Sequence, residues 1–319
     1  MLSVPEIIFY YVQTLLFPKD LVALHSWAVT SVQLSNFFLP LLIDIVAFGT
    51  ILTAFWFTYR KKSREKIALL FLGWFVIGLC VHLQIFPIDM TVADHYFYFP
   101  FIGLLGLLGL VLQQLPFKRQ HLILVVTIEV ILLAACSART MVRNTDWINQ
   151  TTLSAHDEKV AENDYLIEML YGLDLLEQDN YTAAYPHIMR AVTLYPQSWK
   201  AWLALGAIYY QRGNLKKAED AYRHSIAIRK SSMAYEDLAL ILLREPADLR
   251  TTMAFLREAT HVYPNSQKLW YYRMIAERKS GDYDNELQAA QNYHFLRGDK
   301  ESESIYMRIL QNQPIKFDL

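Results

Sequence analysis

Three residues able to do acid–base chemistry fall in one short stretch between two apolar segments. Asp89 and Asp94 are the only carboxylates between the apolar segments that end at Phe86 and begin at Tyr96. His95 directly follows Asp94. A carboxylate and an imidazole side by side serve as general base and acid in many enzymes. The structural alternative, which we prefer for Asp94, is a helix cap that accepts the backbone N–H of Tyr96 or Phe97. Asp89, Asp94 and His95 are therefore the candidate catalytic residues.

Other chemical motifs are missing from the sequence. The nine histidines show no H-E-x-x-H or paired metal-ligand spacing, so we expect no metal site and no cofactor on this ground. Cys80 and Cys136 both lie in apolar runs and define neither a disulfide framework nor a metal site. We expect His156-Asp157 to be a solvated helix start.

The charge balance argues against a nucleic-acid partner. Residues 1–143 carry 10 Lys/Arg and 7 Asp/Glu, and residues 144–319 carry 20 and 24. Neither part has the basic excess of a nucleic-acid binder. The chain is nevertheless 54% hydrophobic and only 19% charged, which is unusual for one soluble domain and indicates a membrane part.

The elements that must position the candidate residues include four apolar segments of transmembrane length. They are Phe37–Tyr59, Ile67–Phe86, Tyr96–Leu115 and His121–Ala138. About 20 apolar residues at a rise of roughly 1.5 Å cover a hydrocarbon core of roughly 30 Å. The loop at 60–66 holds five basic residues and the loop at 87–93 holds none, so the first is predicted to be cytoplasmic. Residues 1–35 and everything after Arg139 then lie on the extracytoplasmic side, partly at the membrane interface.

Small and acidic residues inside these segments have distinct expected roles. Gly103, Gly106 and Gly109 recur every three residues and leave one helix edge open to close approach by another helix. Asp44 and Glu129 are ionisable groups at membrane depth, which usually face a bundle interior or a cavity. They either contact a substrate or lipid, or form a helix–helix hydrogen bond as protonated acids. We prefer the second interpretation.

From residue 164 on, the sequence repeats with a period of 34, the length of a tetratricopeptide (TPR) unit. Pairs separated by 34 or 68 are Gly172 and Gly206, Ala184 and Ala218, Pro196 and Pro264, Trp202 and Trp270, and Gly213 and Gly281. The predicted units are 165–198, 199–232, 233–266 and 267–300, each a helix pair, followed by a capping helix Glu301–Gln311. We expect Gly206 and Ala218 to lie where two helices approach too closely for larger side chains.

A groove for a partner is expected along the first helices of these units, which line the concave surface of a TPR array. Superposing the units places there Lys200, Leu203, Ala207, Tyr210, Arg244, Lys268, Tyr271 and Arg278. Their basic and aromatic character suits an extended or acidic polypeptide held by salt-sensitive contacts. The alternative is plain packing between repeats, which we prefer for Trp202, Tyr209 and Trp270 but not for Tyr210 or Tyr271.

Two stretches together resemble a known group of membrane proteins. Val92-Ala-Asp-His-Tyr-Phe-Tyr-Phe-Pro100-x-Ile-Gly103 resembles the V-A-E/D-R-Y-x-Y-x-P-x-x-G element of transmembrane-and-TPR proteins, which include O-mannosyltransferases of the GT-C glycosyltransferase superfamily. Arg143-Asn-Thr-Asp-Trp147 is similar to the segment that leads into their TPR array, and Phe17-Pro18 with His25-Ser-Trp27 is similar to an earlier loop. The resemblance covers nearly the whole chain, but only the C-terminal part of such a protein.

The apolar segments and the 34-residue period together predict an all-α protein: a polytopic membrane bundle of about four spans at 36–143, then a TPR α-solenoid at 144–319. We expect an integral protein of the plasma (cytoplasmic) membrane or endoplasmic reticulum with extracytoplasmic repeats. The resemblance implies a polyprenyl-phosphate sugar donor if the protein is an enzyme. In that superfamily the catalytic carboxylates lie upstream of these elements, and His95 stands where the group usually has arginine, which clamps phosphate better. We expect this chain alone to transfer no sugar. The alternative function is a non-catalytic, membrane-anchored TPR scaffold that binds a protein partner.

Overall fold

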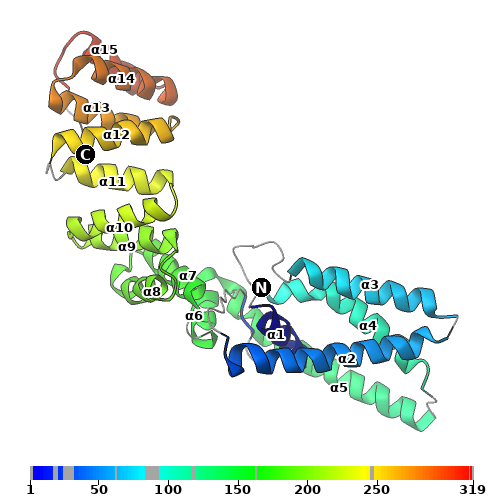
Figure 1. Ribbon diagram of the computed structural model, residues 1–319. Coiled ribbons are helices and arrows are strands. Elements are labelled where there is room, and N and C mark those ends of the chain that lie inside the picture. Colours follow the sequence, from blue (N-terminus) through cyan, green and yellow to red (C-terminus); the bar gives the residue numbers. More distant parts are fainter. Residues whose placement is uncertain are drawn as a thin grey trace. The chain divides into compact units, whose positions relative to one another are not determined.

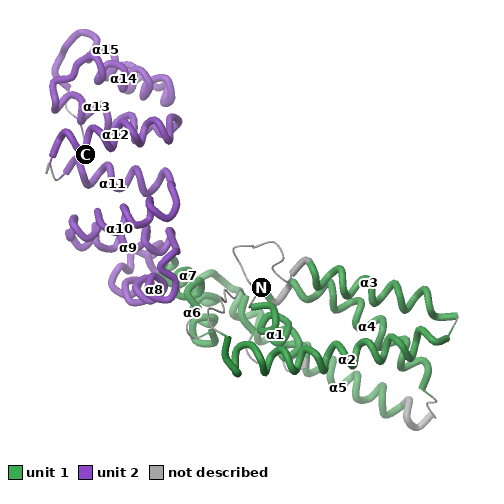
Figure 2. Tube along the Cα trace, in the orientation of Figure 1, with its two compact units in different colours: residues 1–174 green, residues 175–319 purple. Residues whose placement is uncertain are grey.

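The computed structural model describes residues 3–16, 21–23, 32–61, 63–82, 93–115, 119–161, 164–244, 248–315 and 317. These residues are mainly helical and include no strand, which confirms the predicted all-α class. The chain forms two compact units, residues 1–174 and residues 175–319 (Figure 2). The boundary between the two units falls within one helix. The domain boundaries predicted from the sequence, after residues 35 and 143, stay predictions.

The N-terminal unit holds the long apolar helices (Figure 1). They are α1 (Val4–Leu16), α2 (Leu39–Tyr59), α3 (Glu65–His82), α4 (Tyr98–Leu112) and α5 (Arg119–Asn144), followed by the more polar α6 (Gln150–Val160) and by α7 (Tyr165–Glu177), which crosses the boundary. Two stretches, Leu34–Tyr59 and Ile123–Asn144, are long and apolar enough to cross a membrane. The apolar helix α4 has 15 residues, so the four-span bundle stays a prediction.

The glycine edge expected in the third apolar segment forms a close helix contact. A Cβ atom at Gly103 would lie 2.6 Å from the carbonyl oxygen of Phe71 and from the backbone nitrogen of Phe75. At Gly106 it would lie 2.2 Å from the Phe71 ring. Helices α3 and α4 therefore meet at backbone distance, as small residues permit. Gly109 faces open space, so its expected contact is wrong for the described residues.

The two acids predicted inside the spans lie in different surroundings. Asp44 on α2 is 4% exposed, and neither of its carboxylate oxygens has a hydrogen-bond partner among the described residues. It lines an apolar cavity of about 440 Å³ between α1 and α2. The preferred helix–helix hydrogen bond is therefore wrong for Asp44. Glu129 on α5 is exposed in the described structure.

The C-terminal unit is a series of antiparallel helix pairs that follow one another along the chain (Figure 1). Its helices are α8 (Tyr181–Leu194), α9 (Trp199–Gln211), α10 (Leu215–Ile228), α11 (Ser232–Arg244), α12 (Leu249–Val262), α13 (Gln267–Ser280), α14 (Tyr283–Arg297) and α15 (Lys300–Leu310). The pairs α9–α10, α11–α12 and α13–α14 coincide with the predicted second, third and fourth units. Helix α15 coincides with the predicted capping helix.

Repeated residues of the C-terminal unit form repeated contacts. A Cβ atom at Gly206 would lie 2.5 Å from the Tyr222 ring, which confirms the expected close approach of α9 and α10. Trp202 and Trp270 each donate their indole N–H to the carbonyl of the proline six residues earlier, at 2.9 and 2.7 Å. The second helix of each pair starts at a side-chain cap, namely Asn180, Asn214, Asp248 and Asp282. These residues are 34 apart and satisfy backbone N–H groups that the helix leaves open.

Candidate functional site

A cavity lined by α11, α13, α14 and α15 brings together three of the eight groove residues named from the sequence. It has a volume of about 390 Å³, within the range of ligand pockets. Its lining residues are Leu240, Arg244, Gln267, Lys268, Tyr271, Tyr272, Tyr293, Arg297 and Glu301. Arg244, Lys268 and Tyr271 thus line one space, together with a third cation, Arg297.

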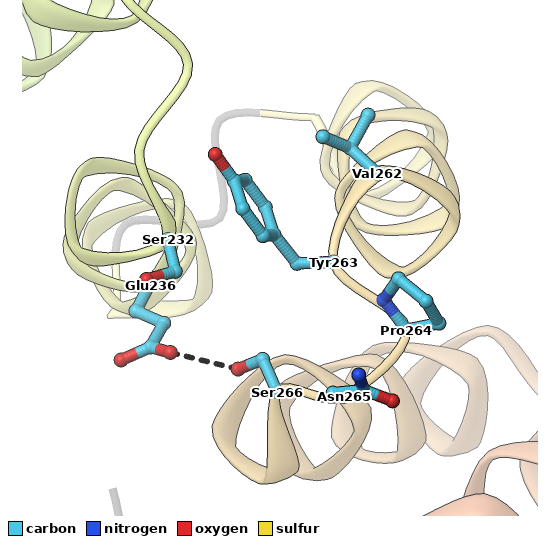
Figure 3. Close-up of a pocket in the computed structure, with 7 residues that line it drawn as sticks. All are labelled: Ser232, Glu236, Val262, Tyr263, Pro264, Asn265 and Ser266. Carbon is cyan, nitrogen blue, oxygen red and sulfur yellow. Dashed lines mark hydrogen bonds between the residues drawn. The ribbon is translucent and has the colours of Figure 1, made fainter.

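The two predicted cations of this cavity are held differently. The Arg244 guanidinium lies 5.4 Å from the centre of the Tyr210 ring and forms no ion pair within the described residues. Lys268 pairs with Glu236 at 3.5 Å. Glu236 in turn accepts a hydrogen bond from Ser266 at 2.7 Å across a neighbouring pocket, where the two side chains point at each other (Figure 3). Arg244 is therefore the cation most available to a carboxylate.

An acid that the sequence interpretation did not name lies beside these cations. Burial, assisted by the nearby carboxylate of Glu236, raises the pKa of Asp237 to about 6. Lys268 and a hydrogen bond from Tyr222 act in the opposite direction. Burial also raises the pKa of Tyr272, and the charge of Asp237 adds to that effect. Part of the groove therefore carries a carboxyl group whose charge changes in mildly acidic solution.

The other two cations predicted for the groove lie elsewhere. Lys200 at the start of α9 is exposed and places its ammonium group 5.7 Å from the Trp199 ring. Arg278 near the end of α13 forms an ion pair with Glu286 of α14. Neither residue lines the cavity around Arg244.

The aromatic residues assigned to packing do pack. Tyr209 meets Tyr185 edge to face at 6.1 Å, and its hydroxyl lies 3.9 Å from the sulfur of Met189. Trp270 is buried in a cluster with Met274. These contacts lie within the repeats and confirm the packing expected for Tyr209 and Trp270.

The candidate catalytic residues of the N-terminal unit are described only in part. Asp89 lies outside the described residues. Asp94 and His95 begin the short 3₁₀ turn η2 (Asp94–Phe97), and their side chains lie outside the description. The N–H of Tyr96 is bonded to the carbonyl of Ala93. The catalytic role and the capping role of Asp94 both stay predictions.

A buried ion cluster joins the end of α5 to α6. Arg143 donates to Asp146 at 3.0 Å and to Asp157 at 3.1 Å, and its guanidinium lies 5.9 Å from the Trp147 ring. His156 lies 3.2 Å from Asp157, which is only 5% exposed. The expected solvated helix start at His156-Asp157 is therefore wrong. The residue that Asp157 pairs with is 14 positions away, so local sequence carried no signal for this pair.

Comparison with protein families and known proteins supports the repeat part. The tetratricopeptide repeat family matches residues 171–232. Human "Protein O-mannosyl-transferase TMTC3" is 26% identical over 137 residues, which are 43% of this chain and 15% of that protein. The chain therefore spans only a small part of the curated relative it matches. These findings establish a TPR-containing chain with a limited similarity to that transferase.

Solved structures of TPR proteins are similar to this chain at low identity. The structure described as "YrrB: a TPR protein with an unusual peptide-binding site" has a TM-score of 0.44 and 12% identity, and the match covers 50% of this chain and 82% of that one. The thermophilic TPR protein TTC0263 from Thermus thermophilus has a TM-score of 0.37 and 19% identity, with 46% and 82% covered.

Proposed function

We propose that the chain is a membrane-anchored TPR protein whose groove binds an extended, acidic polypeptide. The observation that carries this proposal is the convergence of Arg244, Lys268 and Tyr271 on one cavity, with Arg244 outside any ion pair within the described residues. Arginine binds carboxylates through a planar fork of N–H donors, and a tyrosine ring offers rigid apolar area. The cavity thus offers both charge and shape to an acidic chain.

Charge reversal tests this function. Purified full-length protein is titrated with a fluorescein-labelled peptide of alternating glutamate, glycine and tyrosine, and binding is followed by anisotropy. We expect Arg244→Glu with Lys268→Glu to weaken binding at least tenfold, and added salt to weaken binding to the wild type. Lys216→Glu, at an exposed position on α10, is the matched control and should bind like the wild type. Equal binding by all three proteins would refute the proposal.

The membrane placement is a second part of the proposal. It is supported by the two long apolar helices and by the five basic residues of the 60–66 loop, which favour the cytoplasmic side for that loop. The repeats then lie on the extracytoplasmic side of the plasma membrane or endoplasmic reticulum. In a background without Cys80 and Cys136, Ser232→Cys should react with an impermeant thiol reagent on the extracytoplasmic side. Ser63→Cys should react only after permeabilisation, and the reverse pattern would overturn this topology.

A second candidate function is participation in sugar transfer to a bound polypeptide. It is supported by the 26% similarity to a protein named as an O-mannosyltransferase, and it requires a polyprenyl-phosphate sugar donor. Incubation of the purified chain with polyprenyl-phosphate mannose and an acceptor peptide tests it. Turnover that Asp89→Asn or Asp94→Asn abolishes supports catalysis by this chain. Absence of turnover favours the non-catalytic scaffold.

A further inference from the structure

A segment of the chain itself lies on the residues predicted to line the groove. After α15 ends at Leu310, residues 313–315 and 317 have no regular secondary structure, and Gln313 and Phe317 contact α13. Arg278 donates a hydrogen bond to the backbone carbonyl of Gln313 at 3.3 Å. Its guanidinium lies 5.7 Å from the centre of the Phe317 ring. Tyr271 meets the same ring edge to face at 5.9 Å.

These contacts have the form of peptide recognition. One side chain, Phe317, lies against both an aromatic ring and a cation, and one backbone carbonyl is bound by the same cation. Extended peptides are commonly held in this way, by main-chain hydrogen bonds together with a few side-chain contacts. Ile315 adds an apolar contact to the cluster around Trp270 and Met274. The groove therefore already shows which chemistry it accepts at this end.

The occupied end of the groove adjoins the open cavity. Arg278 stands 34 residues after Arg244, so the two arginines occupy equivalent places in successive repeats. Arg244 lies over Tyr210 and faces the cavity, whereas Arg278 lies over Phe317. Tyr271 contributes to both places, because it lines the cavity and contacts the Phe317 ring. A ligand lying along the groove would thus meet Phe317 next to the two predicted cations of the cavity.

We propose that Gln313, Ile315 and Phe317 act as an internal substitute for the partner. The partner is an extended polypeptide that places an aromatic side chain between Tyr271 and Arg278, and carboxylates beside Arg244 and Lys268. Binding displaces Phe317 from this place. This inference rests on the groove being the polypeptide site proposed above, and it adds the aromatic residue to the acidic character of the ligand.

Phe317 is tethered to the repeats by a short link, so its displacement by a free peptide is measurable as competition. Only six residues separate Leu310, the end of α15, from Phe317, and a segment on so short a link has an effective concentration in the millimolar range. A free peptide that uses the same place must compete with it. Weakening the internal contact should therefore increase the apparent affinity for such a peptide.

The test uses full-length protein and a labelled peptide with the sequence of residues 313–319, Gln-Pro-Ile-Lys-Phe-Asp-Leu. We expect Phe317→Ala to bind this peptide at least tenfold more tightly than the wild type does. A peptide with alanine in place of phenylalanine should bind neither protein. Adding Arg278→Gln to Phe317→Ala should remove the gain. Phe295→Ala removes a phenylalanine that is 85% exposed on α14, and this control should behave as the wild type.

Three results would overturn the inference. The first is equal peptide affinity for the wild type and Phe317→Ala. The second is a lowered melting temperature of Phe317→Ala without any peptide binding, which would make the segment a permanent part of the fold. If the alanine variant does not fold, the measurement is repeated with Phe317→Leu, which keeps apolar bulk. The third is that an acidic peptide binds the wild type and Phe317→Ala equally, while Arg244→Glu abolishes its binding. That result would overturn the displacement of Phe317 and leave the proposed function standing.

Discussion

The two units of this protein stabilise their helices by different means. In the N-terminal unit, the polar helix α6 starts at the Asn149 side chain, but the apolar helices α2 and α4 have no side-chain cap, because each continues a preceding helical turn. Large apolar side chains of α2, such as Leu42, Ile45 and Val46, are exposed. In the C-terminal unit, each helix from α8 to α10 and from α12 to α15 starts at an Asn, Ser or Asp side chain that accepts a backbone N–H. A helix in water must satisfy its open N–H groups locally. Polar bonds at the helix ends therefore recur throughout the repeats, whereas the apolar helices of the other unit depend on an apolar outer surface and close helix packing.

Glycine illustrates the same contrast on a smaller scale. Gly103 allows α4 to approach the backbone of α3, whereas Gly206 allows α9 to approach only the Tyr222 side chain of α10. A backbone neighbour cannot move away without distorting its helix, but a ring is able to shift. Close approach in the N-terminal unit is therefore the stricter requirement.

The largest expected effect comes from breaking a buried ion pair of the repeats. Glu277 is fully buried and accepts hydrogen bonds from Arg257 at 2.9 and 3.1 Å, with Arg273 at 3.5 Å. Glu277→Leu leaves the half-buried Arg273 without its carboxylate partner and should lower the free energy of unfolding by about 3 kcal/mol. Urea unfolding followed by circular dichroism measures this. The exposed Glu303→Leu is the control, and a loss as small as that of the control would show that polar bonds do not hold this unit together.

Glycine-to-alanine substitutions compare the energetic cost of crowding a backbone with the cost of crowding a ring. Gly103→Ala should cost about 2 kcal/mol, because its Cβ meets backbone atoms at 2.6 Å. Gly206→Ala should cost about 1 kcal/mol, because the Tyr222 ring moves. Gly109→Ala meets open space and should be neutral or stabilise the helix by up to about 1 kcal/mol. Thermal unfolding of each variant gives the order, and an equal cost at Gly103 and Gly109 would contradict the contact of α3 with α4.

A single cap should contribute less. The side chain of Asn214 accepts the N–H of Lys217 at 3.2 Å and starts α10. Asn214→Ala should lower the free energy of unfolding by about 1 kcal/mol. Asn214→Gly should lower it by only a few tenths of a kcal/mol, because glycine is tolerated at this position. Equal losses for the two variants would mean that the cap hydrogen bond does not stabilise α10.

The smallest expected effect is a pH dependence within the groove. The pKa of Asp237 is raised to about 6 by burial, so the folded protein holds this proton more tightly than the unfolded chain, where the pKa is about 4. The resulting stabilisation is complete below about pH 4 and is lost as the pH rises through 6. Asp237→Asn should remove this dependence, whose contribution to stability is close to zero at about pH 7, above the pKa of the folded state. Melting temperatures of both proteins between pH 4 and pH 7 measure it, and parallel curves would assign the effect to another group.

Much of the repeat architecture was predictable from one period. The spacing of 34 placed the helix pairs, the capping helix and the close approach at Gly206, because each residue type answers to a local packing requirement. Two further features were readable from the same spacing and were missed. The Asx caps recur every 34 residues from Asn180, and Asp237 lies 34 residues after Leu203, a position already assigned to the groove.

Other features depend on contacts that local sequence does not encode. Arg278 occupies a groove position, but its ion pair with Glu286 and its contact with Phe317 depend on how α14 and the C-terminal segment fold back. The burial of Asp157 depends on Arg143, at the end of a different helix. The pattern of residues indicated the surface, and only the structure showed which of its members remain available to a partner.

Photo-crosslinking of a defined peptide shows directly whether a polypeptide binds in the groove. The acidic, tyrosine-containing peptide of the binding assay carries one benzophenone group, is irradiated with the full-length protein, and the labelled residues are mapped by mass spectrometry. We predict labels on α11 (Ser232–Arg244) and α13 (Gln267–Ser280), lost when unlabelled peptide competes and in Arg244→Glu with Lys268→Glu. Labels confined to the second helices α12 and α14, or unchanged by charge reversal, would contradict a peptide-binding groove at this place.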